Sequence, residues 1–173
     1  MRRLDFEDFS KIVHLANIRI SPDDKLVSFV TIRSDLEKNR YNYEIWIKDL
    51  NTLETVAVLS SDSKDYDQVW FNNKSLLFLS RRGSKEDEKG NAIFYYPLFS
   101  EPRQIFRSDK GINSIRVTKE GNIAFSSPWT EGKTDEDYVT IEDFLCGEMD
   151  QVSQTDIMSI YILEIPTQVF SSK

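Results

Sequence analysis

The 173-residue sequence predicts an all-β protein built from repeated four-stranded antiparallel units, with a short helix ahead of the first unit. Three observations lead to this prediction. A motif of an extended residue, a polar turn and an apolar strand occurs three times, a second apolar strand follows each copy, and the strands are apolar on both faces. Together they indicate that whole sheets, and not single hairpins, repeat along the chain.

The repeated motif keeps the same order of an extended residue, a polar turn and an apolar strand, although the residues of its turn differ. It occurs at residues 20–30 (ISPDDKLVSFV), 70–80 (WFNNKSLLFLS) and 117–127 (VTKEGNIAFSS). When the strand aromatics are aligned, Phe78 follows Phe29 by 49 positions and Phe125 follows Phe78 by 47. Proline in the first turn, paired asparagines in the second and glycine in the third all favour reversal of the chain. The spacing is close to the length of a propeller blade.

A second apolar strand follows each copy of the motif. It lies at residues 44–50 (EIWIKDL), 92–98 (AIFYYPL) and 159–165 (SIYILEI). Its equivalent residues are Trp46, Phe94 and Tyr161. The polar segments 54–59 and 102–106 then fit a fourth, outer strand of the first two units. Each unit is therefore expected to be a sheet of four strands.

The strands of the motif lack the apolar–polar alternation of a sheet that is covered on one side only. In the second copy, Leu76 and Phe78 lie on one face and Leu77 and Leu79 on the other. The first copy repeats this arrangement, with Leu26, Val30 and Ile32 against Val27 and Phe29. Strands that are apolar on both sides need cover on both sides. The blades of a β-propeller provide such cover, whereas a β-sandwich, the main competing fold, predicts no repeat of whole sheets.

The residues ahead of the first motif favour a helix. Phe6, Phe9, Val13 and Ala16 fall on one approximate helical face, and acidic residues stand early, as the start of a helix prefers. The sequence therefore predicts an N-terminal helix within residues 1–17, followed by blade 1 at residues 18–60.

Blade 2 is expected at residues 61–108 and blade 3 at residues 109–173. Blade 3 is longer because it carries an acidic insertion, at about residues 130–156, between its second and third strands. The spacing of the acids does not match the order of ligands in an EF-hand, so a solvated loop is expected. The insertion also contains large apolar residues that we expect to dock on a partner surface, namely Tyr138, Val139, Ile141, Phe144 and Leu145.

Charge and composition exclude several classes of function. The 29 acidic and 22 basic residues give a formal charge of −7, which disfavours a surface that follows nucleic-acid phosphates. No apolar run approaches the ~18 residues of a membrane helix, and the N-terminus mixes acids into what would be the apolar part of a signal peptide. The single cysteine, Cys146, cannot form an internal disulfide. These features predict a cytoplasmic protein without a membrane or nucleic-acid partner.

No catalytic, cofactor-binding or metal-ligating residue is predicted. The six glycines include neither the G-x-S-x-G elbow of a serine hydrolase nor a phosphate-binding loop. The only histidine, His14, has no nucleophile motif near it and is expected to be a surface or packing residue. The charged stretch 83–91 (GSKEDEKGN) is typical of a solvated hairpin loop, and Cys146 of a small packing residue.

The chain resembles the N-terminal propeller of the prolyl oligopeptidase family, and specifically its acylaminoacyl-peptidase type. Four stretches carry the resemblance and cover nearly the whole chain: FSKIVHLANIRISPDDKLVSFV (9–30), RSDLEKNRYNYEIWIKDL (33–50), WFNNKSLLFLSRRGSKEDEKGNAIFYYPL (70–98), and EDYVTIEDF (136–144) ahead of SIYILEI. The acidic stretch in the third blade is the most specific of the four, because the other turn and strand patterns occur in many propellers.

The resemblance implies a seven-bladed propeller that caps an α/β-hydrolase domain of the same or a companion polypeptide. In that family the propeller restricts entry, so that short or unfolded peptides reach the catalytic serine. Seven units would need over ~300 residues, so three blades of an incomplete propeller are expected within residues 1–173, without the hydrolase domain. No catalytic residue can be transferred to this sequence.

Two further functions fit the same repeat. One is a stand-alone interaction module that self-associates, because an open propeller exposes the edges and faces of its blades. The other is a TolB-like binding propeller, which is weaker without an export signal. Neither alternative predicts peptidase activity.

Overall fold

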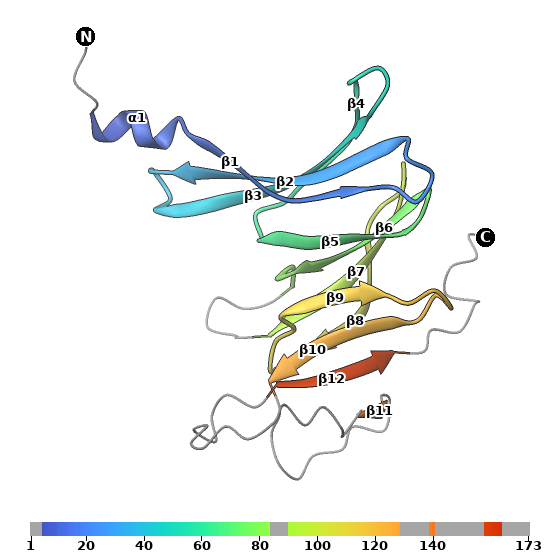
Figure 1. The fold of residues 1–173 in the computed structure, drawn as a ribbon. Coiled ribbons are helices and arrows are strands. Elements are labelled where there is room, and N and C mark those ends of the chain that lie inside the picture. Colours follow the sequence, from blue (N-terminus) through green and yellow to red (C-terminus); the bar gives the residue numbers. More distant parts are fainter. Residues whose placement is uncertain (1–4, 84–89, 129–138, 141–157, 164–173) are drawn as a thin grey trace, which may run out of the picture.

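The computed structural model describes residues 5–83, 90–128, 139–140 and 158–163. Within these residues the chain forms one short helix and twelve strands, which pair into three four-stranded antiparallel sheets (Figure 1). The sheets follow one another face to face along the molecule.

The first sheet is a meander of four strands in chain order: β1 (Val13–Ile20), β2 (Leu26–Asp35), β3 (Arg40–Asp49) and β4 (Thr55–Ser60). The proline-containing turn between β1 and β2 closes through the Ser21 amide, which donates to the carbonyl of Leu26 at 2.8 Å. Asp24 holds the left-handed φ of 56° that reverses the chain. Asp is among the residues that tolerate this conformation, and this explains why the motif needs no glycine here.

The second sheet repeats the meander with β5 (Asp65–Asn72), β6 (Ser75–Ser80), β7 (Asn91–Pro97) and β8 (Arg103–Ser108). An equivalent hydrogen bond occurs in each of the two sheets, at the end of the third strand. The amide of Leu50 donates to the carbonyl of Lys25 at 2.8 Å, and the amide of Leu98 donates to the carbonyl of Lys74 at 2.9 Å. The predicted outer strands are confirmed as β4 and β8.

The third sheet contains β9 (Ser114–Val117), β10 (Ile123–Pro128), β11 (Val139–Thr140) and β12 (Met158–Leu163). Its order is β11-β12-β10-β9, so the outer position beyond β12 is held by β11, which precedes β12 in the chain. β11 comes from the predicted insertion. The rest of the insertion, with its acidic and apolar residues other than Val139, lies outside the described residues.

The aromatic residues that align in the repeat are direct cross-strand partners in each sheet. Their pairs are Phe29 with Trp46, Phe78 with Phe94 and Phe125 with Tyr161. The repeat read from the sequence therefore corresponds to one strand register in all three sheets.

The prediction of strands buried on both faces is confirmed for the second sheet, where every residue of β6 is buried. Leu76 and Phe78 pack into a core shared with the first sheet, which contributes Val30, Ile45 and Ile47. The alternating residues Leu77 and Leu79 pack into a second core, with residues of the third sheet such as Ile115, Ile123 and Phe125. Because side chains alternate across a strand, one sheet can complete two cores.

The predicted N-terminal helix is wrong beyond Ser10. Helix α1 comprises Phe6–Ser10, and Val13 and Ala16 lie in β1. Residues 13–16 pair with β2, and Ala16 packs against the core of the first two sheets. Backbone pairing with β2 outweighs the weak helical pattern, which is too short to bury a face of its own. The first sheet therefore begins at Val13 and not at residue 18.

Candidate functional site

The first strands of the three sheets, β1, β5 and β9, lie at corresponding edges and run side by side (Figure 1). In a β-propeller the first strands line the central axis, so this edge is the wall that a molecule passing along the axis would meet. We call the surface formed by β1, β5 and β9 the inner wall.

The inner wall contains two equivalent β-bulges. The register of β1 shifts between Ala16 and Arg19, and that of β5 shifts between Tyr66 and Val69. A residue with positive φ lies within each shift, Asn17 with 50° and Asp67 with 48°. Asn and Asp are the non-glycine residues that best tolerate this conformation, and a bulge redirects the side chains next to it.

The bulge of β5 directs polar side chains toward β1. The Gln68 side chain is fully buried, and its Nε2 donates to the carbonyl of Asn17. Two residues further on, the indole Nε1 of Trp70 donates to the carbonyl of Arg19 at 3.2 Å. These two side chains satisfy carbonyls of β1 and join the first strands of the first and second sheets.

A third side chain joins β5 to β9. Oδ2 of Asp67 accepts a hydrogen bond from the backbone amide of Ile115 at 2.9 Å. The guanidinium of Arg116 lies 4.0 Å from the other carboxylate oxygen. A carboxylate that accepts a backbone N–H forms a stronger bond than a neutral acceptor does. The three inner strands are thus linked by side chains of β5, which fix the spacing of the inner wall.

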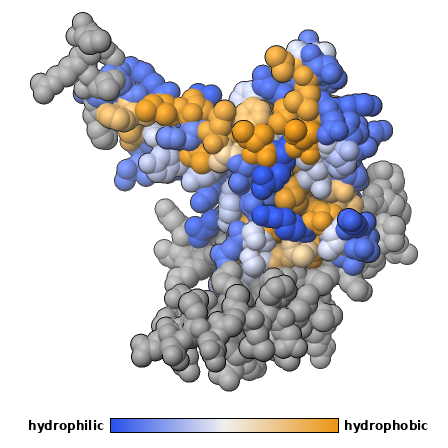
Figure 2. All heavy atoms as spheres, in the orientation of Figure 1, coloured by the Kyte–Doolittle hydropathy of each residue, from blue (hydrophilic) through white to orange (hydrophobic). Residues whose placement is uncertain are grey.

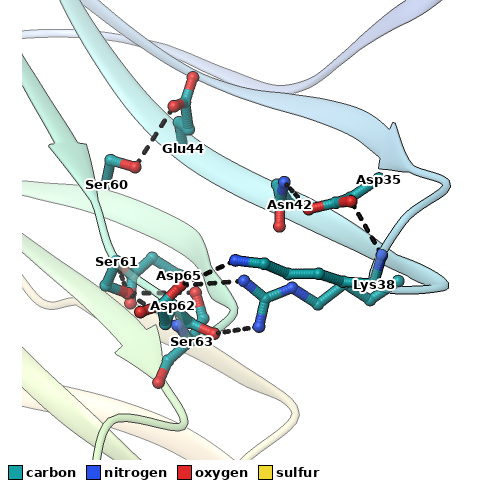
Figure 3. A network of polar contacts seen from close by, with 10 residues as sticks. Asp35, Lys38, Asn42, Glu44, Ser60, Ser61, Asp62, Ser63 and Asp65 are labelled. Carbon is teal, nitrogen blue, oxygen red and sulfur yellow. Dashed lines mark hydrogen bonds and ion pairs between the residues drawn. The ribbon is translucent and has the colours of Figure 1, made fainter. Parts of the chain in front are cut away.

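A polar network ties the β2–β3 hairpin to the segment that leads into β5 (Figure 3). Nη2 of Arg40 lies 2.9 Å from the carboxylate of Asp62, and Nζ of Lys38 lies 3.8 Å from it. The hydrogen bond from Arg40, together with the charge of Lys38, holds the pKa of Asp62 below its ordinary value of 3.8. The pKa of Asp35 is also lowered, chiefly because its carboxylate accepts the backbone amide of Lys38 and the side-chain amide of Asn42.

A buried ion pair joins Asp65, the first residue of β5, to Arg82, which follows β6. The Asp65 side chain is fully buried, and its two oxygens accept from Nε and Nη2 of Arg82 at 3.2 and 2.6 Å. The hydroxyl of Ser61 donates to the same carboxylate at 3.0 Å. The Arg82 guanidinium also lies over the rings of Phe78 and Phe94, at 5.6 and 5.8 Å from their centroids. The arginine therefore joins the polar end of the sheet to its aromatic core.

The second sheet is joined to the start of the third by an amide side chain. Asn91 donates through Nδ2 to the carbonyl of Ile112 at 2.8 Å and accepts the amide of the same residue through Oδ1 at 2.6 Å. These two hydrogen bonds resemble those that a pair of residues on neighbouring antiparallel strands exchange. It fixes the chain where it leaves the second sheet for β9.

A shallow pocket of about 290 Å³ lies where α1 meets the β2–β3 hairpin. Phe9, Leu36 and Tyr41 line it and are exposed by 58%, 50% and 61%. Asp35 and Arg40 also line the pocket, and both belong to the network above.

The structure places His14 on β1, where it is exposed, and not in a helix. Among the described residues no group of three or more His, Cys, Asp or Glu is arranged to hold a metal ion. Cys146 and residues 84–89 of the charged loop lie outside the described residues. No helix in the part of the chain that the structure describes is long and apolar enough to cross a membrane.

Sequence reasoning missed the residues that fix the inner wall and the buried ion pair, namely Asp65, Asp67, Gln68 and Arg82. The available signal was the polar stretch DYDQ immediately ahead of the apolar VWF in β5. Polar residues in a strand that is otherwise buried need specific partners.

No protein-family model matches the sequence, and no curated protein matches it. Solved structures of similar fold do match. An acylaminoacyl peptidase of Pyrococcus horikoshii aligns at 19% identity with a TM-score of 0.62, over 83% of this chain and 21% of that one. An acylaminoacyl peptidase in complex with Z-Gly-Gly-Phe-chloromethyl ketone aligns at 18% identity with a TM-score of 0.64, over 91% of this chain and 24% of that one.

A third structure is the β-propeller domain of the Trilobed protease from Pyrococcus furiosus. It aligns at 18% identity with a TM-score of 0.52, over 68% of this chain and 35% of that one. The chain thus spans about a fifth to a third of the length of these structures. The three sheets described above are consecutive blades of a β-propeller, and their fold is that of the propeller found in acylaminoacyl peptidases and related proteases.

Proposed function

We propose that the chain is the non-catalytic propeller part of a serine peptidase of the acylaminoacyl-peptidase type. In this role it restricts the access of peptides to an α/β-hydrolase domain of the same or a companion polypeptide. The observation that carries the proposal is the fold likeness to two acylaminoacyl peptidases over 83% and 91% of this chain. A cytoplasmic setting is part of the proposal and is supported by the low cysteine content.

The inner wall supports a gating role because its width is held by specific bonds. Gln68 and Trp70 tie β5 to β1, and Asp67 ties β5 to β9. An opening excludes substrates by size only if it does not widen when a larger substrate binds against it. Side-chain bonds between neighbouring inner strands supply that resistance where no backbone ladder joins them.

The first experiment tests for catalysis by the chain itself. Purified residues 1–173 are assayed with an N-acylated amino-acid p-nitroanilide and with a short N-acetylated peptide. We expect no turnover above buffer. Turnover that persists through repeated purification, and that an active-site serine reagent abolishes, would contradict a non-catalytic role.

The second experiment tests gating in the polypeptide that carries the hydrolase domain, identified by sequencing the native coding region and by the intact mass of its product. Trp70→Phe keeps an aromatic ring but removes the donor to Arg19. We expect this variant to raise kcat/KM for long peptides relative to short ones. The matched variant Leu53→Ala, at a residue that is 67% exposed and lies between β3 and β4, should leave that ratio unchanged. An unchanged ratio in Trp70→Phe would count against gating by the inner wall.

A further inference from the structure

The outer strand of the first sheet, β4, pairs with β3 on one side and with no described strand on the other. It lies at the opposite edge of the sheet from β1, and in Figure 1 it stands out at the top of the view. Figure 2 shows hydrophobic side chains on this projecting part of the sheet, where Val58 is exposed by 40%. An edge strand presents a row of unpaired N–H and C=O groups, so it offers hydrogen bonds to a further strand.

β4 lacks the residues that commonly prevent such pairing. Its sequence, TVAVLS, contains neither a charged residue nor a proline. The equivalent outer strand of the second sheet, β8, has the sequence RQIFRS and carries Arg103 and Arg107. Each of the two strands has one register shift against its neighbour, so a bulge does not account for the difference. Because native sheets block association with charges and prolines at their edges, the edge of β4 is the one suited to strand pairing.

The side chains of β4 are apolar on both sides of the sheet. Leu59 is 7% exposed and belongs to the core shared with the second sheet, against which Ala57 also packs. Val58 lies between these two residues and opposite Trp46, so it is on the other side of the sheet. A strand that extends the sheet beyond β4 therefore needs apolar residues on both of its sides. β4 is itself such a strand, which makes its edge self-complementary.

We propose that two copies of the chain associate by antiparallel pairing of β4 with β4, which joins their first sheets, of four strands each, into one sheet of eight. A twofold axis perpendicular to the sheet relates the copies, so the association closes as a dimer. Such an axis keeps every side chain on its own side of the sheet, so the residue at the axis meets its own counterpart. We place the axis at Val58, the middle of the apolar residues 57–59. Val58 then lies opposite Val58 of the second copy, and Leu59 lies opposite Ala57.

The charges in and around β4 fit this arrangement. Residues 55–60 bring no charge into the contact, whereas pairing of β8 with itself would bring arginines together. The register places Glu54 of one copy beside Asp62 of the other. Asp62 is in contact with Arg40 and Lys38, and these two positive charges exceed its single negative charge. Glu54 therefore approaches a locally positive region at both ends of the pair.

The contact between two strands is small, so the dimer should be weak and reversible. It covers Val58 and satisfies the backbone groups at the edge of β4. This inference does not depend on the proposed peptidase function, because β4 lies at the outer edge of the first sheet and takes no part in the inner wall.

Sedimentation equilibrium of the purified chain over a wide concentration range tests the proposal. We expect a dimer in reversible exchange with the monomer. Val58→Lys and Val58→Glu each place two like charges opposite each other at the axis, so each variant alone should associate at least about tenfold more weakly, the effect of ~1.4 kcal/mol. Val58→Thr keeps the branched shape without a charge and should associate almost as strongly as the unmodified chain. Phe99→Lys, at a residue between β7 and β8 that is 78% exposed, should have no effect.

A mixing experiment shows whether β4 meets β4. In an equimolar mixture of Val58→Lys and Val58→Glu, opposite charges face each other at the axis, so the mixture should regain association as a heterodimer. If β4 paired with a different surface of the second copy, or with another protein, the mixture would stay as weak as its components and the proposal would be wrong. A dimer that neither charge weakens, or a chain that stays monomeric throughout the concentration range, would also overturn it.

Hydrogen exchange gives a second readout of the same contact. Raising the protein concentration should slow exchange at amides of residues 55–60 and leave the amides of β8 unchanged. Equal behaviour of the two outer strands would contradict pairing at β4.

Folding of the variants is checked by circular dichroism and thermal unfolding. If the charged variants of Val58 do not fold, Glu54→Lys replaces them, because Glu54 is exposed. Its new positive charge would face Lys38 and Arg40 of the second copy and should weaken association. The matched charge reversal Glu120→Lys, at an exposed residue of the turn between β9 and β10, should not. Equal association of these two variants would overturn the proposed pairing.

Discussion

Phe78 and Phe94 lie directly opposite each other on β6 and β7, with ring centroids 5.6 Å apart and ring planes 23° from parallel. The Arg82 guanidinium lies over both rings, and both belong to the core shared with the first sheet. This stacked pair belongs to the interface between the first and second sheets. The same two residues are aligned positions of the sequence repeat, cross-strand partners and members of the buried core.

Removing the ring of Phe78 should destabilise the protein strongly. Phe78→Ala leaves a cavity at a residue that is 0% exposed, and the expected loss is about 3–5 kcal/mol of unfolding free energy. The matched change Phe99→Ala removes the same ring at a residue that is 78% exposed and should stay within about 0.5 kcal/mol. Urea unfolding followed by circular dichroism measures both. Equal losses in the two variants would contradict the assigned core.

Breaking the buried ion pair should cost more than removing both of its members. Arg82→Ala leaves the fully buried carboxylate of Asp65 with its guanidinium partner gone, and we expect a loss of about 3–5 kcal/mol. The double variant Asp65→Leu with Arg82→Ala removes the uncompensated charge and should recover part of that loss. Lys38→Ala, in the exposed contact with Asp62, should change the unfolding free energy far less. A double-mutant cycle by urea unfolding measures the coupling, and additive effects would disprove it.

Asp67 should hold the amide of Ile115 against exchange with solvent. Asp67→Ala removes the acceptor and places alanine at a φ of 48°, so it should speed hydrogen exchange at that amide and destabilise the chain by about 1–3 kcal/mol. Asp67→Asn keeps an acceptor and tolerates the same backbone conformation, so its effect should be smaller. Exchange at Ile115 that is the same in all three proteins would show that the carboxylate does not protect it.

Acid should weaken the polar network between the first two sheets. The hydrogen bond from Arg40 lowers the pKa of Asp62 in the folded chain below the ordinary value of 3.8. A group whose folded pKa is depressed stabilises the protein above its unfolded pKa, and that stabilisation is lost as the pH falls through the folded pKa. Asp62→Asn should therefore be less stable than the unmodified chain at neutral pH and equal to it well below pH ~3.8.

Thermal unfolding between neutral pH and pH ~2.5 measures this difference, and added salt should reduce it because Asp62 is exposed. The matched variant is Asp109→Asn, at another exposed aspartate, whose carboxylate lies 3.9 Å from Arg107 at the end of β8. That variant should differ less from the unmodified chain across the same pH range, because its contact is longer. A gap between Asp62→Asn and the unmodified chain that persists in acid would point to a cause other than charge.

The sequence predicted the strands and the equivalent aromatic positions of the three units, because both follow from local patterns. The aromatic residues that align in the repeat fix one register, since a slip by one residue would turn every side chain to the other face. Apolar residues on both faces of β6 predicted two cores, and Leu76 and Leu77 do pack into different cores. The turns could also be predicted, because proline, asparagine and glycine each favour a backbone conformation that reverses the chain.

The N-terminal segment and the edge of the third sheet were harder to predict. Val13 and Ala16 fit a helical face and a strand equally well, and only the pairing of β1 with β2 selects the strand. β11 takes the outer position of the third sheet although it precedes β12 in the chain, which no local pattern indicates.

The sequence by itself determined the repeated sheets and the burial of their strands, because hydrophobic periodicity and turn chemistry act over a few neighbouring residues. Only the tertiary structure decided which polar residues fix the inner wall. Gln68 and Asn17 are 51 positions apart, and Asp67 and Ile115 are 48 positions apart, so they meet only when whole sheets stack. The same stacking covers Phe78, whereas no sheet among the described residues packs on the side of the first sheet that holds Phe29, although the two residues occupy equivalent positions in the repeat.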